Sequence, residues 1–221
     1  MLKNYIKIAW KVLQRRKFFT FVSLFGISLT LMVLMVLTAF IDHIFSSNYP
    51  EINRDKCLYV NYATMSHKKN GGYSNGATGF HFIEHYVKKM KTPQKIAMTS
   101  LAPKKVDAFY GDNRQKLFIK TIDANFWEIM AFEFKTGKPF NQQHLEEGAR
   151  VAVITEKTRK GYFGDRMDVL GETIEIGLEK YKIIGVVKGV PITQVLTSAD
   201  IYVPYTTCLL YTSDAATNRE V

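Results

Sequence analysis

The hydrophobic pattern of this 221-residue chain is dominated by one uncharged stretch, residues 18–41 (FFTFVSLFGISLTLMVLMVLTAFI). As a helix it would extend roughly 36 Å, enough to cross a hydrocarbon core of about 30 Å with some tilt. Most of its residues are Leu, Ile, Val or Phe, and its Ser and Thr hydroxyls can hydrogen-bond to helix carbonyls. The pattern therefore predicts a transmembrane helix. The alternative, a buried core helix, rarely runs this long without a polar face.

The preceding segment, residues 1–17, is basic and amphipathic. Three lysines recur every four residues, and three large apolar side chains line another side of the same helix (Lys3, Lys7, Lys11; Ile6, Trp10, Leu13). This spacing predicts a helix in the plane of the membrane interface, with lipid as its partner and the tryptophan at headgroup depth. Two other roles stay open: a charged anchor that only sets topology, and a docking surface for a cytoplasmic partner.

The charges on either side of the apolar stretch predict its orientation. Lys and Arg but no acids precede it, whereas acidic and basic residues are nearly balanced just after it. Because positively charged flanks stay inside, we expect a cytoplasmic N-terminus, a location in the cell inner membrane, and a periplasmic or extracytoplasmic position from Asp42 onward. A cleaved signal peptide starts similarly, but this apolar run is too long and no convincing small-x-small cleavage site follows it. We therefore expect an uncleaved anchor.

Residues 42–207 contain short apolar segments separated by turn residues. We expect the long helix to continue as a stalk until Pro50 stops it, and a mobile glycine-rich loop over residues 66–79. Strands are predicted at residues 57–62, 95–100, 106–110, 116–122, 150–154, 172–176 and 181–188, and helices at residues 80–91, from residue 125, and from residue 155 to 163. Strands and short helices in mixed order predict an α+β domain rather than a parallel sheet with regular crossovers.

Turn and cap residues support several of these elements. Gly111, Asp112 and Asn113 are typical of a hairpin turn between the strands that they separate. Asn125 is a predicted N-cap, as is Thr155, whose helix should end at Gly164. A second hairpin is predicted across residues 177–179.

The last segment, residues 208–221, differs in character from the rest. Its beginning, CLLYTSDAA, resembles the conceptual translation of a transposase-end adapter used in DNA library preparation. Such scars are excluded from fold reasoning. We therefore expect a non-native tail, and expect the native protein to continue beyond Thr207.

Composition narrows the possible partners. The formal net charge is +10, but much of it lies before the apolar stretch, so the basic balance indicates membrane topology more than nucleic-acid binding. No zinc-finger or RNA-binding signature is present, and we expect no nucleic-acid partner. The only cysteines are Cys57 and Cys208, which do not indicate a disulfide framework.

The clearest catalytic motif is the H-x-x-E-H string formed by His81, Glu84 and His85. On a helix, the two histidines lie one turn apart and could bind zinc, with Glu84 as the general base. A third ligand cannot be identified in the sequence. Exposed histidines on an amphipathic helix are the favoured interpretation, and a membrane-anchored zinc hydrolase is the alternative.

Other chemical motifs are weaker. No Gly-x-Ser-x-Gly elbow or Walker sequence is present, so serine hydrolysis and ATP hydrolysis by this chain are not indicated. Cys57 is expected to be a small core residue of a strand. Glu146 and Glu147 are adjacent and should point apart, and Asp123 is expected to cap or turn the chain. We therefore predict no catalytic, cofactor-binding or metal-binding residues, and no cofactor.

A series of segments in a fixed order carries a family resemblance. They are DANFWEI at residues 123–129, GKPF at 137–140, VAVITE at 151–156, YFG at 162–164, LGETI at 170–174, and YKIIGVVKGVP at 181–191. The series resembles the periplasmic core domain of MacB/FtsX-type ABC transporter permeases. NYIKIAW at residues 4–10, followed by basic residues and the apolar stretch, resembles the N-terminus of the same family.

The resemblance covers nearly all of residues 1–207 and implies a function. Members are permeases with four spans and a large extracytoplasmic domain between the first two. They dimerise or pair with a second permease, work with a separate ABC ATPase, and in some systems with a periplasmic adaptor. This sequence has only the first span, which agrees with the truncation inferred from the tail. The resemblance implies a non-enzymatic subunit of an efflux or related system that couples the ATPase to export or to extracytoplasmic work.

A single-pass sensor with an extracytoplasmic ligand-binding domain is the alternative. It would need cytoplasmic output machinery, for which 17 residues are too few unless a second span follows. Exporters, lipoprotein-release systems and regulators of wall hydrolases share the permease layout. The substrate therefore does not follow from the resemblance.

Overall fold

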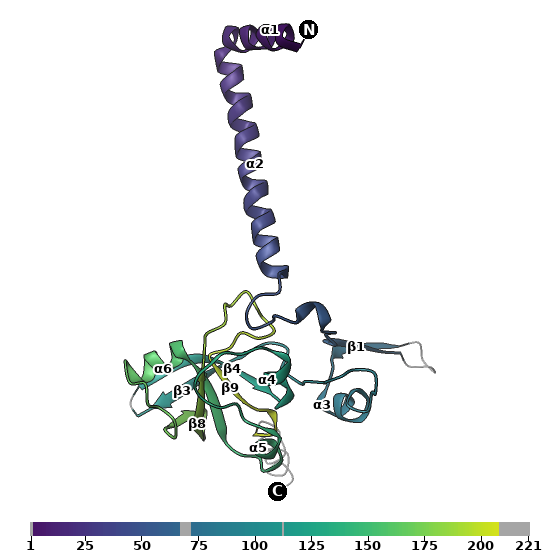
Figure 1. Cartoon of the computed structure of the whole chain (residues 1–221). Helices are drawn as coiled ribbons and strands as arrows, with labels where there is room; N and C mark the ends of the chain where they lie inside the picture. Colours follow the sequence, from purple (N-terminus) through teal and green to yellow (C-terminus); the bar gives the residue numbers. More distant parts are fainter. Residues whose placement is uncertain (1, 67–71, 112, 208–221) are drawn as a thin grey trace. The chain divides into compact units, whose positions relative to one another are not determined.

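The computed structural model describes residues 2–66, 72–111 and 113–207. The chain divides into two compact units, Met1–Ser46 and Ser47–Val221. The first unit holds two helices and the second holds the β-sheets (Figure 1). The expected non-native tail, residues 208–221, lies outside the described residues.

The first unit consists of α1 (Leu2–Arg15) and α2 (Lys17–Phe45). Arg16 separates them, because its φ of −122° and ψ of 63° interrupt the helical path. Across this break, Thr20 Oγ1 donates a hydrogen bond to the carbonyl oxygen of Leu13 (2.9 Å). The chain therefore bends between the basic helix and the apolar helix, and Figure 1 shows α1 lying across the end of α2.

Among the described residues, α2 is the one helix long and apolar enough to cross a membrane. Its hydroxyl groups bond back to its own backbone as predicted: Thr30 Oγ1 donates to Gly26 O (2.8 Å) and Thr38 Oγ1 to Leu34 O (2.9 Å). The predicted stalk up to Pro50 is wrong, because α2 ends at Phe45 and Ser46 is extended. Ser and Asn favour caps and turns over helix interiors.

The second unit is built around a seven-stranded mixed sheet with the order β5-β8-β6-β9-β4-β3-β7. Its strands are β3 (Lys104–Tyr110), β4 (Asn113–Ile122), β5 (Phe134–Gly137), β6 (Val151–Thr155), β7 (Thr173–Ile176), β8 (Glu179–Val187) and β9 (Ile201–Pro204). The β4–β9 and β6–β8 pairs are parallel, and the other pairs in the sheet are antiparallel. Because β7 pairs with both β3 and β8, the sheet closes on itself. The α+β fold class is confirmed.

Local turn chemistry explains the correctly predicted elements. β3 and β4 form a hairpin in which Tyr110 faces Asn113, with Gly111 at a φ of 55°. β7 and β8 form the second predicted hairpin. Thr155 Oγ1 accepts from the backbone N–H of Thr158 and caps α6 (Glu156–Phe163), which ends at Gly164 with a φ of 59°. Such positive φ values favour glycine.

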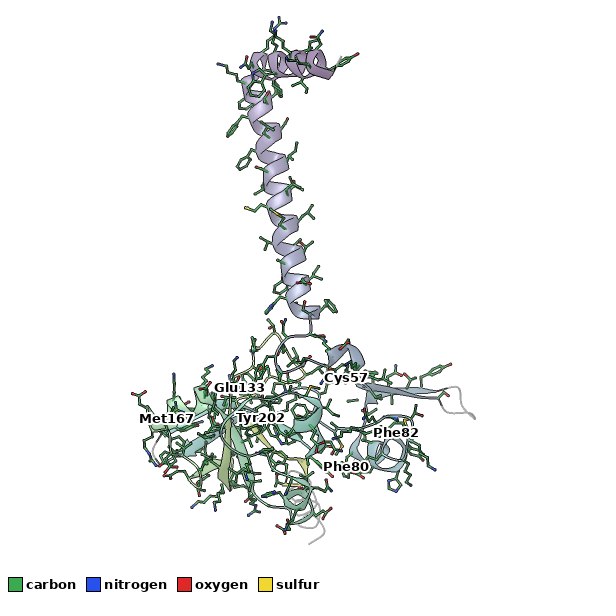
Figure 2. The ribbon with its side chains drawn as sticks, in the orientation of Figure 1. Cys57, Phe80, Phe82, Glu133, Met167 and Tyr202 are labelled. Carbon is green, nitrogen blue, oxygen red and sulfur yellow. The ribbon has the colours of Figure 1, made fainter. Side chains whose placement is uncertain are left out.

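Apolar side chains cover both faces of the sheet. One cluster is completed by α6, which contributes Tyr162 and Phe163. The other is completed by α4 (Asn125–Ile129), which contributes Phe126 and Trp127, and by α5 (Gln142–Glu146). Successive residues of β6 alternate between the two clusters, which is why the whole strand is buried. In Figure 2, Tyr202 of β9 lies among the strands in the middle of this unit.

Gly137 is required by the contact between β5 and β8. A Cβ at this position would lie 2.1 Å from the carbonyl oxygen of Ile184, and its φ is 73°. Gly185 meets the same restriction from the opposite side, since its Cβ would lie 2.8 Å from the carbonyl oxygen of Lys138. Both glycines therefore permit two backbone segments to approach closely.

The region before β3 differs most from the predictions. The predicted strand at residues 57–62 is wrong: the chain there is unpaired until β1 (Tyr62–Ser66), which pairs with β2 (Tyr73–Ala77). Part of the expected loop therefore forms a strand, β2. The glycine and small polar residues of β2 disfavour a strand, but β1 supplies the hydrogen-bond partner that it needs. Residues 67–71 of that loop lie outside the described residues.

The two predicted elements that follow are shorter than expected. The helix predicted over residues 80–91 consists of α3 (Phe80–Phe82) and a π-helical turn, η2 (Ile83–Val87). The strand predicted over residues 95–100 is reduced to one antiparallel bridge between Thr99 and Ile122. A short 3₁₀ turn, η1 (Arg54–Lys56), also lies in this part of the chain.

Besides β2 and η1, three further short elements were not predicted: β5, α5 and β9. Each has only four or five residues. β9 ends in Pro204, and a proline argues against a strand interior when only sequence is considered. Its parallel pairing with β4 determines its conformation.

Candidate functional site

The first segment of the second unit, residues 49–51, is held inside that unit by backbone and side-chain hydrogen bonds. Tyr49 Oη donates to the carbonyl oxygen of Lys188 (3.2 Å) and accepts from the backbone N–H of Glu133 (3.1 Å). The next residue, Pro50, is buried, and its carbonyl oxygen accepts from the backbone N–H of Ala131 (2.9 Å). These bonds join three segments that are far apart in sequence. We call residues 49–51 with their partners the junction.

Aromatic contacts strengthen the junction. The Tyr49 ring packs edge-on against Phe132, with ring centroids 6.2 Å apart. On the same ring, Lys188 Nζ lies 5.0 Å from the centroid, within the range of a cation–π contact. Tyr49 is therefore held by its hydroxyl and by its ring, and its position depends on Lys188, directly after β8, and on the segment before β5.

A buried acid completes the junction. Glu51 is 2% exposed, and its Oε1 accepts from Thr197 Oγ1 (2.7 Å). Its Oε2 lies 3.7 Å from Arg54 Nε in an ion pair. A buried carboxylate is costly unless it is paired and hydrogen-bonded, and both partners are present here. Glu51 therefore ties the segment after α2 to the loop before β9.

Lys120 in β4 is the cation buried near this acid. The residue is fully buried, and its Nζ donates to the carbonyl oxygen of Val195 (3.2 Å). Burial lowers the pKa of Lys120 to about 8, and the charge of Glu51 opposes this fall. The domain therefore contains a buried lysine whose pKa is held up by the charge of a buried acid, Glu51.

Stability should depend on pH through Lys120. Its pKa in the folded chain, about 8, lies below the ordinary value of 10.5, so the unfolded chain binds more protons between these values and stability rises with pH. From about pH 7.5 to about pH 9.5 we expect the free energy of unfolding to rise by about 2 kcal/mol. Lys120→Met should remove this rise. Urea unfolding of the detergent-solubilised chain at both pH values measures it, and an identical rise in the variant would contradict the assignment.

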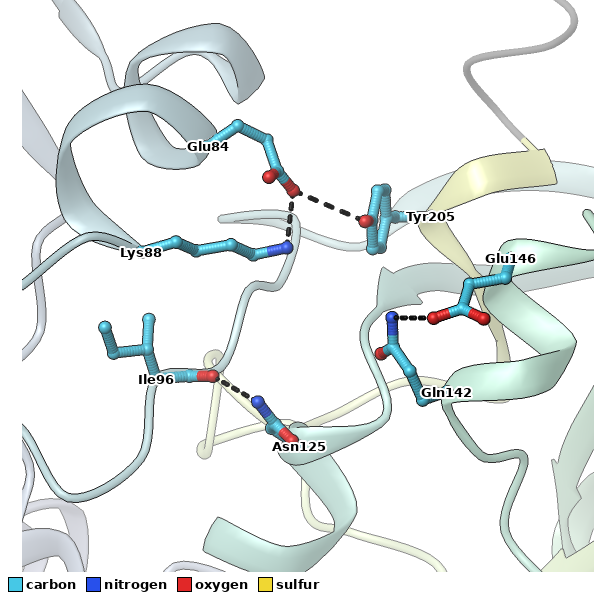
Figure 3. Close-up of polar contacts among 7 residues, drawn as sticks. All are labelled: Glu84, Lys88, Ile96, Asn125, Gln142, Glu146 and Tyr205. Atoms are coloured by element: carbon cyan, nitrogen blue, oxygen red, sulfur yellow. Dashed lines mark hydrogen bonds and ion pairs between the residues drawn. The ribbon is translucent and has the colours of Figure 1, made fainter.

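A second polar cluster attaches α3 and η2 to the end of β9 (Figure 3). Glu84 forms an ion pair with Lys88 and accepts a hydrogen bond from Tyr205 Oη (3.5 Å). Lys88 Nζ lies 5.6 Å from the Tyr205 ring centroid. The ring centroids of Phe80 and Tyr205 are 5.3 Å apart. Glu84 of the H-x-x-E-H string therefore faces a lysine and a tyrosine.

The structure places the other parts of that string as follows. His85 is exposed. The side chain of His81 lies outside what the structure describes. Within the described part of the chain, no three His, Cys, Asp or Glu side chains are grouped so as to hold a metal ion. The contacts of Glu84 give it a structural role at the base of α3 and η2.

The remaining candidate residues have local roles. Asp123 Oδ1 accepts from the backbone N–H of Phe126 (3.0 Å) and so caps α4, and burial raises the pKa of Asp123 to about 6. Asn125, the predicted cap, instead lies within α4 and donates to the carbonyl oxygen of Ile96 (2.7 Å; Figure 3). Glu146 and Glu147 accept from Gln142 and Gln143, each one turn earlier. Cys57 is half-buried and lies after η1, outside any strand.

Sequence reasoning missed the junction residues Tyr49, Glu51, Lys120 and Thr197. The one available signal is that Lys120 shares a face of the predicted strand 116–122 with the apolar residues Phe118 and Ile122. A strand with one solvated face would leave this lysine exposed. Here both faces of the sheet are covered, so Lys120 is enclosed.

These observations define the chain as a closed mixed α+β domain preceded by a bent pair of helices, the second of which is a candidate membrane span. The family model for the MacB-like periplasmic core domain matches residues 20–220. The chain belongs to this family, which confirms the resemblance seen in the sequence.

Two curated relatives illustrate the similarity. The macrolide export ATP-binding/permease protein MacB of Acinetobacter baylyi is 26% identical over 120 residues, covering 53% of this chain and 18% of that protein. The uncharacterized ABC transporter permease YknZ of Bacillus subtilis is 26% identical over 148 residues, covering 65% of this chain and 36% of that protein. The chain thus matches well under half the length of these relatives.

Solved structures from the same group are also similar. The periplasmic region of MacB from Actinobacillus actinomycetemcomitans has a TM-score of 0.47 at 21% identity and covers 56% of this chain and 53% of that one. The extracellular domain of YknZ from Gram-positive bacteria has a TM-score of 0.48 at 21% identity and covers 58% of this chain and 63% of that one.

Proposed function

We propose that this chain is part of the permease subunit of an ABC transporter, and that it couples a separate ATPase to export or to other extracytoplasmic work. Membership in the MacB-like family supports the transporter class. The names of the relatives, macrolide export ATP-binding/permease protein and ABC transporter permease, support pairing with an ATPase. ATP hydrolysis is assigned to that separate subunit, and a second permease copy and a periplasmic adaptor are the further partners.

The junction is the observation that supports coupling between α2 and the sheet. Only residues 46–48 separate the end of α2 from Tyr49, whose hydroxyl and ring are both held by the second unit. Pro50 and Glu51 extend this attachment to the segment before β5 and to the loop before β9. Because so few residues separate them, a displacement of the end of α2 would reach the sheet through the junction.

The proposed orientation places α1 in the cytoplasm, α2 across the inner membrane and the sheet outside. The absence of acids before Asp42, against six Lys or Arg residues in the first 17, supports this orientation. The exposed apolar surface of α2 supports a lipid environment, since its side chains are exposed to solvent throughout most of its length.

The function is tested by purifying the chromosomally expressed protein, tagged at its N-terminus, from detergent-solubilised membranes. We expect an ABC ATPase subunit to copurify and the complex to hydrolyse ATP. We also expect ATP to change the rate at which added protease cleaves the sheet domain. A Gly-Gly-Ser insertion after Asn48 should keep the ATPase bound but remove this change, because it makes the junction flexible. The matched control carries the same insertion at Leu178, an exposed hairpin residue.

Three outcomes would overturn the proposal. Recovery of the chain without an ATPase would favour the single-pass sensor. An equal nucleotide effect in the insertion variant would show that the junction does not transmit motion. In intact spheroplasts, loss of the N-terminal tag to external protease would reverse the orientation.

A further inference from the structure

One face of the closed sheet is only partly covered. The apolar cluster completed by α4 and α5 includes side chains of β4, β5, β6, β8 and β9, but within the described residues it includes none of β3 or β7. In β3, Val106, Ala108 and Tyr110 pack into the other cluster. Because successive side chains of a strand point to opposite faces, residues 105, 107 and 109 lie on the uncovered part.

Strand register extends this uncovered part across four strands. Arg114 of β4 lies opposite Phe109 of β3, and its guanidinium carbon lies 5.8 Å from the Phe109 ring centroid. Phe109 also lies opposite Glu175 of β7, which in turn lies opposite Lys180 of β8. Side chains directly opposite each other share a face. These four residues therefore form a row that spans about 14 Å, at about 4.8 Å per strand.

Cations dominate this part of the sheet. Their sequence neighbours, such as Leu117 and Tyr181, pack into the first cluster. The exposed cations come from β3, β4 and β8 and define what we call the basic face: Lys105, Arg114, Lys116, Lys180 and Lys182. Asp107 and Glu175 are its acids, so its net charge is +3. Residues 47–207 carry 23 basic and 17 acidic residues, a net charge of +6, and the basic face supplies half of it.

The surroundings of Asp107 show how closely these cations are grouped. Arg114 donates to it through both Nε and Nη2, at 3.3 and 3.0 Å. These bonds lower the pKa of Asp107, and the positive charges of Lys116 and Lys105 lower it further. One acid therefore lies among three cations and offsets the charge of only one of them.

Exposed apolar side chains accompany the cations. Phe118 of β4, on the same face, is 37% exposed. Leu178 in the β7–β8 turn is 86% exposed. The backbone N–H of Gly177 donates to the carbonyl oxygen of Asp107 (3.1 Å), which holds this turn beside β3. The basic face thus offers apolar contacts together with its charge, and aromatic and arginine side chains are enriched at protein–protein interfaces.

We propose that the basic face binds an acidic segment of another protein, one that carries apolar side chains between its acids. Charge complementarity favours an acidic partner, and the exposed Phe118 and Leu178 favour one with apolar groups. A uniform polyanion fits less well, because Asp107 and Glu175 would each face a like charge. The proposal concerns the sheet domain and does not depend on an ATPase or on membrane orientation.

Fluorescence anisotropy with the full-length, detergent-solubilised chain tests this proposal. The probe is a fluorescein-labelled peptide of glutamate, phenylalanine and glycine, and the comparison ligand is labelled polyglutamate of the same net charge. We expect the mixed peptide to bind more tightly than polyglutamate. We also expect its binding to weaken from about 0.1 M to about 1 M salt, as the Debye length falls from about 10 Å to about 3 Å.

A triple variant, Lys105→Gln, Lys116→Gln and Lys182→Gln, removes charge but keeps Arg114 on Asp107. Because each exposed ion pair contributes little, we expect the Kd of the mixed peptide to rise about 10-fold. The matched control changes three exposed lysines elsewhere in the sheet domain to glutamine and should leave the Kd unchanged: Lys89, Lys91 and Lys157.

A second variant, Asp107→Asn with Glu175→Gln, tests the discrimination against uniform polyanions. We expect it to tighten the binding of polyglutamate several-fold more than that of the mixed peptide. An equal Kd for the mixed peptide in the triple variant and the unchanged chain would overturn the proposal. So would polyglutamate binding at least as tightly as the mixed peptide to the unchanged chain, which would indicate a general polyanion site.

Discussion

Trp127→Ala is expected to lower the free energy of unfolding of the sheet domain by about 3–5 kcal/mol. The indole is 7% exposed and lies at the centre of an aromatic cluster. Its ring centroid lies 5.2 Å from Phe132, 5.3 Å from Phe134, and 5.4 Å from both Phe140 and Tyr202, in edge-on arrangements. Such pairs add stabilisation beyond the buried area. Removing the indole would leave a large cavity among rings contributed by β5, by β9 and by the loops on either side of β5.

Pulse proteolysis of the detergent-solubilised chain across a urea series measures this loss. The signal then comes from the sheet domain and does not depend on tryptophan fluorescence. Leu178→Ala is the matched control, because this apolar residue is 86% exposed in a hairpin turn and should change stability by less than about 0.5 kcal/mol. A loss below about 1 kcal/mol for Trp127→Ala would mean that the cluster collapses around the cavity.

Glu51→Ala is expected to lower the free energy of unfolding by about 3 kcal/mol at neutral pH. The variant leaves the Thr197 hydroxyl without its carboxylate acceptor. It also removes the negative charge that opposes the fall in the pKa of Lys120. Removing one partner of a buried charge pair costs more stability than the intact pair contributes, because the other charge stays buried without compensation.

Lys120→Met separates the two effects of Glu51→Ala: the loss of the acceptor for Thr197 and the loss of the charge that acts on Lys120. Because methionine of similar length removes the buried charge, this single change is expected to be neutral or stabilising at neutral pH. In the double variant, the loss caused by Glu51→Ala should shrink, and the difference measures the coupling between the two charges. Glu147→Ala, at an exposed residue directly after α5, is the control for loss of an acid. Strictly additive effects would show that Glu51 acts through Thr197 and Arg54 alone.

Local sequence patterns were sufficient to predict many of the strands and helices of the sheet domain. The β3–β4 and β7–β8 hairpins and the capped helix α6 were predicted because their signals lie within a few residues: turn glycines, a threonine cap and alternating apolar residues. β2 and β9 were missed because each becomes a strand only when a partner distant in sequence is present. Pro50 predicts too late an end for α2, because the extended backbone of Ser46 already ends the helix.

The sequence by itself determined the apolar span, its basic flank, the α+β class and the family resemblance, because each is encoded in local periodicity, charge or contiguous segments. Only the tertiary structure decided that Tyr49 meets Lys188, that Glu51 meets Thr197, and that Lys120 is buried. Their contacts cross up to 146 residues of chain. Whether a lysine on a strand is solvated or buried depends on what covers that face. At Lys120 the covering elements come from both ends of the domain, which no local pattern specifies.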